Sequence, residues 1–392
     1  MKRIGVEERR ARLAVRHHLA RSVASPERVA ASIVGYHSSD PATVFLSAWA
    51  RVRGFAPTQL EELLYDRRSL VRMLGMRRTL FVVQREVAAV MDAACTKSLA
   101  PGERKRLIRM LEEQGVAEEG TGERWLLRVA TKTLDALGTR GEATARELTR
   151  DVPELAARLH FGEGKTWGGT MGVSTRVLFL LAAEGKVVRA RPLGGWTSGQ
   201  YRWARTEAWL GEPLPRPGAA EARAELLRRY LRAFGPATLT DVRWWTGWTA
   251  GLATGALHAV GAMEVELDEG TGFVLPDDVR RVRRPGAWVA LLPGLDPTVM
   301  GWKERDWFLG DHASHLFDRN GNAGPTVWAD GRVVGGWGQA GDGGIRVELL
   351  ERIDAATRRA IDAERERLRA WLGDVRIVSR FRTPLERTLS GR

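Results

Sequence analysis

A pattern of helices followed by a β-hairpin recurs three times along the chain, and it constrains the fold more than any other feature. The first repeat has helical periodicity over residues 26–34, 42–53 and 57–65, then short apolar strands over 70–75 and 79–83. The second repeat has helices over 124–138, 143–152 and 173–184, then strands over 186–191 and 200–203. The third has helices over 219–233, 238–245 and 249–260, then strands over 263–267 and 272–275. This order predicts winged-helix units in tandem.

From residue 285 onward the pattern changes to short strands, so the fold class expected for the whole chain is α+β. Strand-like runs cover 288–292, 323–328, 332–337 and 347–350, a long amphipathic helix covers 354–372, and alternating residues over 376–382 predict a last strand. A stretch with three prolines and a glycine, 213–218, is the clearest linker. We expect winged-helix domains over 1–95, 96–212 and 213–284, and a β-rich domain with a long helix and basic tail over 285–392.

The charge of the chain points to a polyanionic partner. There are 61 Lys and Arg residues against 48 Asp and Glu, which gives a net charge of +13, and each phosphate that such a surface neutralises releases counterions. The single cysteine, Cys95, excludes a disulfide within the chain and a cysteine-based zinc site. Neither an apolar run long enough to span a membrane nor a secretory signal is visible. We therefore expect a cytoplasmic protein without membrane contact.

The segment Gly35-Tyr36-His37-Ser38-Ser39-Asp40-Pro41 concentrates polar groups between two predicted helices. Asp40 and Pro41 are typical of the N-cap and first turn of the second helix. If residues 37–39 are extended, His37 and Ser39 project to the same side. A capped turn with a solvated histidine is the simplest interpretation of the segment alone. The alternative is a catalytic pair facing one space.

Three phrases of the sequence, together with the tandem units, resemble one known family. They are Gly35 to Pro41 followed by Leu46-Ser47-Ala48-Trp49-Ala50-Arg51; Leu291-Leu292-Pro293-Gly294-Leu295-Asp296-Pro297; and Leu316-Phe317-Asp318 through Gly324-Pro325-Thr326-Val327 to Asp330-Gly331-Arg332-Val333-Val334-Gly335-Gly336-Trp337. Because these segments occur in the same order as in that family, nearly the whole chain resembles the AlkZ/YcaQ family of winged-helix DNA glycosylases.

The resemblance implies both a fold and an activity. In that family three winged helices scaffold a β-barrel, and a C-shaped concave face grips double-stranded DNA from which alkylated purines are excised. The family's catalytic motif is Gln–apolar–Gln or Gln–apolar–Asp before Asp-Pro, whereas the matching positions here are His37, Ser38 and Ser39. The resemblance thus places His37 and Ser39 in the catalytic positions with different chemistry. An imidazole titrates near neutrality and is able to exchange a proton with water or with the leaving base.

From these observations we expect a monofunctional DNA glycosylase that repairs double-stranded DNA containing a damaged base. Its substrate is an alkylated or deaminated purine such as hypoxanthine, and it acts as a monomer in the cytoplasm, associated with the nucleoid, without cofactor or metal. His37 and Ser39 hold the attacking water, and Asp296 stabilises positive charge on the sugar. No lysine lies in the motif, which argues against a Schiff-base lyase step.

The remaining site residues are predicted contacts with the substrate and the duplex. Ser38, Asp40, Trp328 and Trp337 are predicted to contact the damaged nucleotide, the tryptophans by stacking. Eight arginines are predicted to bind phosphates: Arg72, Arg77, Arg78, Arg189, Arg191, Arg202, Arg380 and Arg382. Two alternatives remain, a non-catalytic tandem winged-helix regulator and a lesion-binding protein without chemistry. Scission at abasic sites after incubation with damaged oligonucleotides would exclude both.

Overall fold

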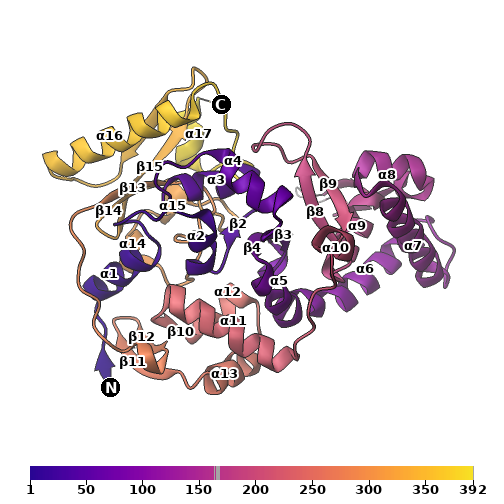
Figure 1. Cartoon of the computed structure of the whole chain (residues 1–392), viewed down its shortest axis with the longest axis horizontal. Helices are drawn as coiled ribbons and strands as arrows, with labels where there is room; N and C mark the ends of the chain where they lie inside the picture. The colour runs from indigo at the N-terminus through magenta and orange to yellow at the C-terminus, as the bar shows by residue number, and fades with distance from the viewer. Residues whose placement is uncertain (163, 165–167, 392) are drawn as a thin grey trace.

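The computed structural model describes residues 1–162, 164 and 168–391, and it shows a mixed α+β protein. Three units that each end in a β-hairpin precede a C-terminal sheet with a long helix (Figure 1). The second unit forms a lobe on the right of Figure 1, and the other parts form the larger body. The predicted repetition of helices followed by a hairpin is confirmed.

The first unit is built around a three-stranded sheet in the order β2-β4-β3. Its elements are α2 (Pro26–Ser32), β2 (Tyr36–His37), α3 (Pro41–Trp49), α4 (Pro57–Glu61) extended by the π-helical turn η1 (Glu62–Asp66), β3 (Leu70–Leu74), η2 (Met76–Arg78) and β4 (Leu80–Gln84). Ser25 and Asp40 cap α2 and α3 through their side chains, and each helix has proline in its first turn. Both helix starts are therefore encoded locally.

The second unit repeats this topology with the strand order β5-β9-β8. It follows α5 (Arg85–Met91), η3 (Asp92–Thr96), η4 (Lys97–Leu99) and α6 (Ala100–Glu113), and contains α7 (Gly122–Arg140), β5 (Glu142–Thr144), α8 (Ala145–Asp151), η5 (Pro153–Ala156), β6 (Arg158–Phe161), β7 (Gly169–Gly172), α9 (Val173–Ala183), β8 (Val187–Pro192), β9 (Tyr201–Arg205) and α10 (Thr206–Leu210). A capping box of Thr144 and Glu147 starts α8. The hairpin β6–β7 was not predicted.

The third unit gains a fourth strand from the N-terminus of the chain. It contains α11 (Ala219–Phe234), β10 (Ala237–Thr238), α12 (Leu239–Thr246), α13 (Ala250–Ala259), β11 (Met263–Leu267), β12 (Gly270–Val274) and η6 (Pro276–Asp278). β1 (Lys2–Arg3) pairs in parallel with β11, so the sheet order is β1-β11-β12-β10. The first residues of the chain thus pack with the third unit rather than with the first.

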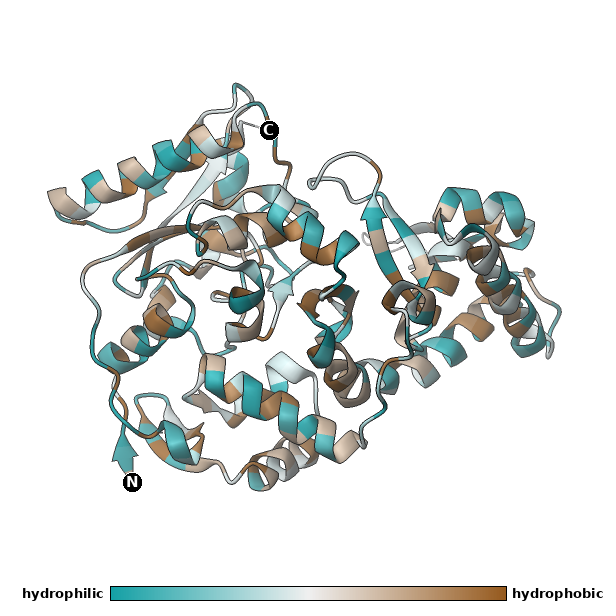
Figure 2. Cartoon of the chain, viewed as in Figure 1, coloured by the Kyte–Doolittle hydropathy of each residue, from teal (hydrophilic) through white to brown (hydrophobic). Residues whose placement is uncertain are grey.

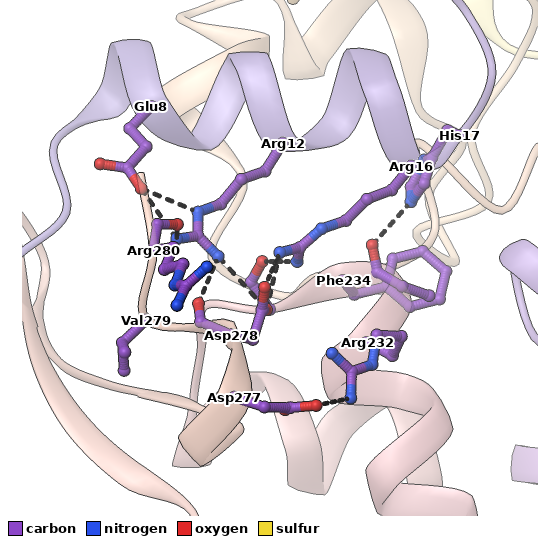
Figure 3. Close-up of polar contacts among 12 residues, drawn as sticks. Glu8, Arg12, Arg16, His17, Arg232, Phe234, Asp277, Asp278, Val279 and Arg280 are labelled. Atoms are coloured by element: carbon purple, nitrogen blue, oxygen red, sulfur yellow. Dashed lines mark hydrogen bonds and ion pairs between the residues drawn. The ribbon is translucent and has the colours of Figure 1, made fainter. Parts of the chain in front are cut away.

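Helix α1 (Val6–Arg16) is held to the third unit by arginines (Figure 3). Arg16 donates to both carboxylate oxygens of Asp278 at 2.6 Å, and Arg12 lies 3.2 Å from the same carboxylate and 2.8 Å from Glu8. Arg12 is almost fully buried, so its charge requires these acidic partners. The acidic partners of Arg12 and Arg16 thus fasten α1 to the third unit.

The C-terminal part is an open sheet in the order β13-β14-β15-β16, not the expected barrel. Its elements are β13 (Val289–Leu292), α14 (Asp306–Leu309), α15 (Ala313–Leu316), β14 (Thr326–Ala329), β15 (Arg332–Gln339), β16 (Ile345–Leu349), α16 (Ala355–Leu372) and α17 (Pro384–Ser390). The predicted last strand over 376–382 is wrong. Gln339 donates to the carbonyl of Val375 and accepts from the amide of Ile377, so a side chain holds this segment in place of a strand partner.

One hydrophobic core joins the first unit, the third unit and the C-terminal sheet, while the second unit has a core of its own. Along α11 and α16, hydrophilic and hydrophobic residues alternate with the period of a helix that buries one face (Figure 2). At the tip of the β8–β9 hairpin, Trp196 packs on Phe45 of α3 and Trp371 of α16. This contact links the second unit to the larger body. Among the described residues, no helix combines the length and apolar composition needed to cross a membrane.

Candidate active site and arginine-lined cleft

The segment from Gly35 to Pro41 is fixed against strand β4. A Cβ atom on Gly35 would lie 2.6 Å from a methyl group of Val83 and 2.9 Å from the Val82 carbonyl oxygen, so only glycine allows this close approach. His37 is paired with Phe81 in the strand register, and the amide of Ser38 donates to the carbonyl of Leu80 at 2.7 Å. The backbone of the segment is therefore held rigidly at the edge of a sheet.

His37 lies in a small, mostly apolar hollow of about 40 Å³. Its ring meets Phe81 edge-on at 5.2 Å between centroids, and the hollow is also lined by Arg77, Trp245 and Asn322. Burial, reinforced by the positive charge of Arg77, lowers the pKa of His37 to about 4. The imidazole is therefore neutral at pH 7, with one nitrogen able to accept a proton.

Ser39 lies at a different, larger cleft. Its hydroxyl accepts the amide of Leu80 at 3.3 Å, and its own amide is 3.5 Å from Nδ1 of His37. Thr79 borders both the hollow of His37 and the cleft of Ser39. The expectation that the two side chains face one space is not met, because β2 ends at His37 and the strand alternation does not continue to Ser39.

The other two polar residues of the segment are buried and have structural contacts. Asp40 caps α3 by accepting the amide of Ala42 at 3.0 Å, as predicted, and its second oxygen accepts the amide of Arg380 at 2.8 Å. Burial raises the pKa of the Asp40 carboxyl. Ser38 is fully buried, and within the described residues its hydroxyl has no hydrogen-bond partner. Neither side chain presents a free polar group to the large cleft.

Asp296 does not lie in a cavity with the histidine, as had been expected for a residue that stabilises the sugar. It is 0% exposed and forms an ion pair with Arg51, at 2.6 Å and 2.9 Å, while Ser47 donates at 2.6 Å and the amide of Thr298 at 2.9 Å. Burial opposes its charge, but Arg51 and the hydrogen bonds from Ser47 and Thr298 together outweigh burial, and the pKa of Asp296 is lowered. All of its acceptor positions are used in joining α3 to the C-terminal part, so we interpret it as a structural residue.

The two tryptophans predicted to stack on a base are also packed into the interior. Trp328 is 0% exposed, stacks on Phe308 at 5.2 Å and donates to Thr326 at 2.9 Å. The stacking prediction for Trp328 is therefore wrong, because no face of its ring is accessible. Trp337 donates to the carbonyl of Leu292 at 2.8 Å and borders a narrow hollow of about 30 Å³ under the C-terminal segment. This hollow has room for water but not for a base.

The largest cleft, of about 820 Å³, lies between the first and second units and is strongly basic. Its lining residues within the described chain include five arginines and no aspartate, glutamate or lysine: Arg72, Arg78, Arg146, Arg189 and Arg380. Aromatic rings lie between them, from Phe179, Tyr201, Trp203 and Phe381. Guanidinium groups interleaved with aromatic rings are typical of surfaces that bind nucleic acid. Ser39 lies on the same cleft.

The other predicted arginines are distributed over different surroundings. Arg77 and Arg78 follow each other with left-handed backbone, φ 52° and 63°, which directs Arg77 to the hollow of His37 and Arg78 to the cleft. Arg191 is paired with Asp66 at 3.0 Å, and Arg78 with Glu103 at 2.9 Å. Arg202 is exposed outside the cleft lining, and Arg382 borders the hollow of Trp337.

Two charged residues that line these cavities were missed in the sequence. Arg146, in the first turn of α8, lines the cleft, but nothing in its sequence context separates it from the many other arginines. Glu386 of α17 lines the narrow hollow, and burial raises its pKa to about 7. An acidic residue three positions after Thr383 is typical of the start of a helix. This pattern could have placed Glu386 in the first turn of a helix, but not at a cavity.

Comparisons with known proteins agree with this description. A family model described as DNA glycosylase AlkZ-like matches residues 30–371. Among solved structures, Streptomyces sahachiroi DNA glycosylase AlkZ is similar with a TM-score of 0.71 and 20% sequence identity, covering 94% of this chain and 98% of that one. This likeness supports the fold. A search of curated protein sequences found no match.

Proposed function

Since the chain belongs to the AlkZ-like DNA glycosylase family, a family of DNA repair enzymes, we propose that its reaction is hydrolysis of the N-glycosidic bond of a damaged purine in double-stranded DNA. The observation that carries the proposal is the cleft whose described lining has five arginines and no acidic residue, and which is lined by Ser39, two positions after His37. The positive cleft binds phosphates, and the rigid segment brings an imidazole close to the bound strand. We interpret the three hairpin units as winged helices, of which the first and second form this cleft together with the C-terminal segment.

We assign the proton-accepting role to His37. Breaking the N-glycosidic bond gives the sugar oxocarbenium character, and a water must add at the anomeric carbon while the base departs. A neutral imidazole in an apolar hollow is able to orient that water and accept its proton. Because Thr79 borders both hollows, one water shared by His37 and Ser39 requires Thr79 to move. We therefore revise the role of Ser39 to contact with the sugar-phosphate backbone.

The protonation state of His37 also bears on the substrate. An alkylated purine such as N7-methylguanine leaves as a neutral base from a cationic nucleotide and needs no acid. Hypoxanthine is neutral in the nucleotide and needs a proton or strong hydrogen bond as it leaves. An imidazole with a pKa of about 4 is a poor acid at pH 7. We propose that alkylated purines are excised faster than hypoxanthine.

The reaction is proposed to end at the abasic site. A lyase step requires an amine that forms a Schiff base with the sugar. No lysine lies in the 35–41 segment, and none is among the described residues that line the cleft. We therefore propose a monofunctional glycosylase.

One assay tests the proposal and separates it from the non-catalytic alternatives. Duplexes bearing N7-methylguanine, N3-methyladenine, hypoxanthine or an interstrand crosslink are incubated with the protein and then treated with hot alkali, which cleaves abasic sites. We expect scission of the alkylated duplexes and slower or no scission of the hypoxanthine duplex. Scission only after alkali, and not before it, marks the monofunctional reaction. Binding without scission of any duplex would refute the proposed reaction and favour a lesion binder.

A further inference from the structure

Within the large cleft, four side chains form a group that we call the arginine–tyrosine cluster: Arg72, Arg189, Tyr201 and Arg380. They come from β3, β8, β9 and the C-terminal segment, and β3 and β8 lie side by side where the two units meet (Figure 1). All four line the cleft. Three arginines converge here from parts of the chain that are far apart in sequence.

The side chains of the cluster's arginines form no ion pair within the described residues, although the charge of Arg380 attracts the nearby Asp40 carboxylate. Arg78 and Arg191 nearby, by contrast, are both paired with carboxylates. Arg72 is 2% exposed; among the described residues, its side chain forms one hydrogen bond, from Nη1 to the Tyr65 hydroxyl at 3.1 Å, and Nε and Nη2 have no partner. A buried guanidinium with free donors is costly unless an anion completes it.

Tyr201 lies between two of these cations. The guanidinium of Arg72 is 4.6 Å from the ring centroid and that of Arg189 is 5.2 Å from it. The Tyr201 hydroxyl is buried and has no hydrogen-bond partner among the described residues. Burial, followed by the charges of Arg72 and Arg380, lowers the pKa of Arg189 to about 10. The aromatic ring thus offsets only part of the repulsion among the three cations.

We propose that the arginine–tyrosine cluster is a binding subsite for one phosphate group of the nucleic-acid backbone. Arg189 and Arg380 contact its oxygens from the cleft, the Tyr201 hydroxyl donates a third hydrogen bond, and Arg72 adds its charge from beneath. The oxygens of a phosphate group, in a free dianion or in a phosphodiester, can accept hydrogen bonds from several guanidinium groups at once. Because Ser39 lines the same cleft, the subsite grips the strand beside the nucleotide that is to be cleaved. That the bound strand is damaged DNA rests on the proposed function. The affinity of the subsite for phosphate does not.

The test uses the full-length chain with inorganic pyrophosphate and an undamaged duplex as probes. Arg189→Met and Arg380→Met are each expected to weaken pyrophosphate binding about tenfold in calorimetry, and to lower the slope of log K against log salt for the duplex by about 1. Arg205→Met is the matched control, because Arg205 is an exposed arginine at the other end of β9, lies outside the cleft lining and is not among the predicted phosphate contacts. It removes the same charge and should leave pyrophosphate binding unchanged. Circular dichroism establishes that each variant is folded.

Two other outcomes would contradict the proposed phosphate subsite. Equal loss of pyrophosphate binding in all three variants would show a general charge effect and no subsite. Pyrophosphate that binds at the cluster without displacing the duplex would show a site for a small free anion, which contradicts a backbone phosphate. Base excision by the wild-type protein is measured separately, so a missing subsite and a missing glycosylase activity are distinguishable.

Discussion

The buried ion pair between Arg51 and Asp296 gives a prediction that distinguishes a structural role of Asp296 from a catalytic one. Asp296→Asn removes the charge that compensates Arg51, while both side chains are 0% exposed. Breaking a buried, hydrogen-bonded pair by neutralising one partner typically costs about 3–5 kcal/mol, because the other charge stays buried. The pair joins the residues directly after α3 to the segment before α14, inside the core shared by the first unit, the third unit and the C-terminal sheet. We therefore expect this body to lose stability as a whole.

Hydrogen exchange followed by mass spectrometry measures this loss with an internal control. Since each 1.4 kcal/mol is tenfold in an equilibrium constant, protection of peptides from α3 should fall by about 100-fold to several thousand-fold. Peptides from α7 and α9 belong to the separate core of the second unit and should keep their protection. Asp311→Asn, at an exposed position, should change neither.

The result that would refute this reasoning is equally clear. If α3 keeps its protection in Asp296→Asn while base excision falls 100-fold or more, the carboxylate acts in the chemistry and our structural interpretation is wrong. If stability falls and the remaining folded fraction excises at the wild-type rate, the structural role is confirmed.

Three further predictions follow from single side chains. Excision under single-turnover conditions should vary little between about pH 5.5 and 8, because the pKa of His37 is lowered to about 4; an ionisation near pH 6.5 in the rate profile would contradict this. The folded protein should lose stability as pH falls from about 6.5 towards 4, since unfolding frees His37 to take up a proton. Burial also lowers the pKa of His17 to about 3 and that of His18 to about 4, so these residues add to the loss; urea unfolding at pH 5.5 should show a loss that is smaller by about 1 kcal/mol in His37→Gln and unchanged in His258→Gln, an exposed control. Gly35→Ala should destabilise the first unit by about 1–3 kcal/mol, because its Cβ would meet Val83 and the Val82 carbonyl; a thermal midpoint equal to that of wild type would show that this backbone yields.

Much of the helical and hairpin framework could be predicted, because periodicity and capping are local properties. The helix predicted over 219–233 is α11 (Ala219–Phe234), and the strand predicted over 263–267 is β11. The helix α6 was missed because its apolar residues are sparse, with only Leu107, Met110 and Leu111 buried. The segment 376–382 alternates like a strand, yet the side chain of Gln339 satisfies its backbone. Strand pairing and closure of a sheet depend on such distant partners.

The candidate site was predictable in its location but less in its geometry. His37 and the cap Asp40 could be identified because the segment is compact in sequence. The separation of His37 from Ser39 depends on where the pairing of β2 with β4 stops, which local residue types do not specify. The prediction that Asp296 stabilises the sugar did not anticipate its buried ion pair, because its partner Arg51 lies 245 positions away in the sequence. Arg146 and Tyr201 joined the cleft only through packing of the second unit on the first.

The most direct test of the account is the single-turnover rate of N7-methylguanine excision by His37→Ala compared with wild type, with duplex affinity measured in parallel. His37→Ala should be at least about 100-fold slower, the usual contribution of a positioned acid–base group, while binding the duplex as tightly, because the cleft arginines are intact. Excision by His37→Ala at the wild-type rate would contradict the proposal that this imidazole handles the attacking water.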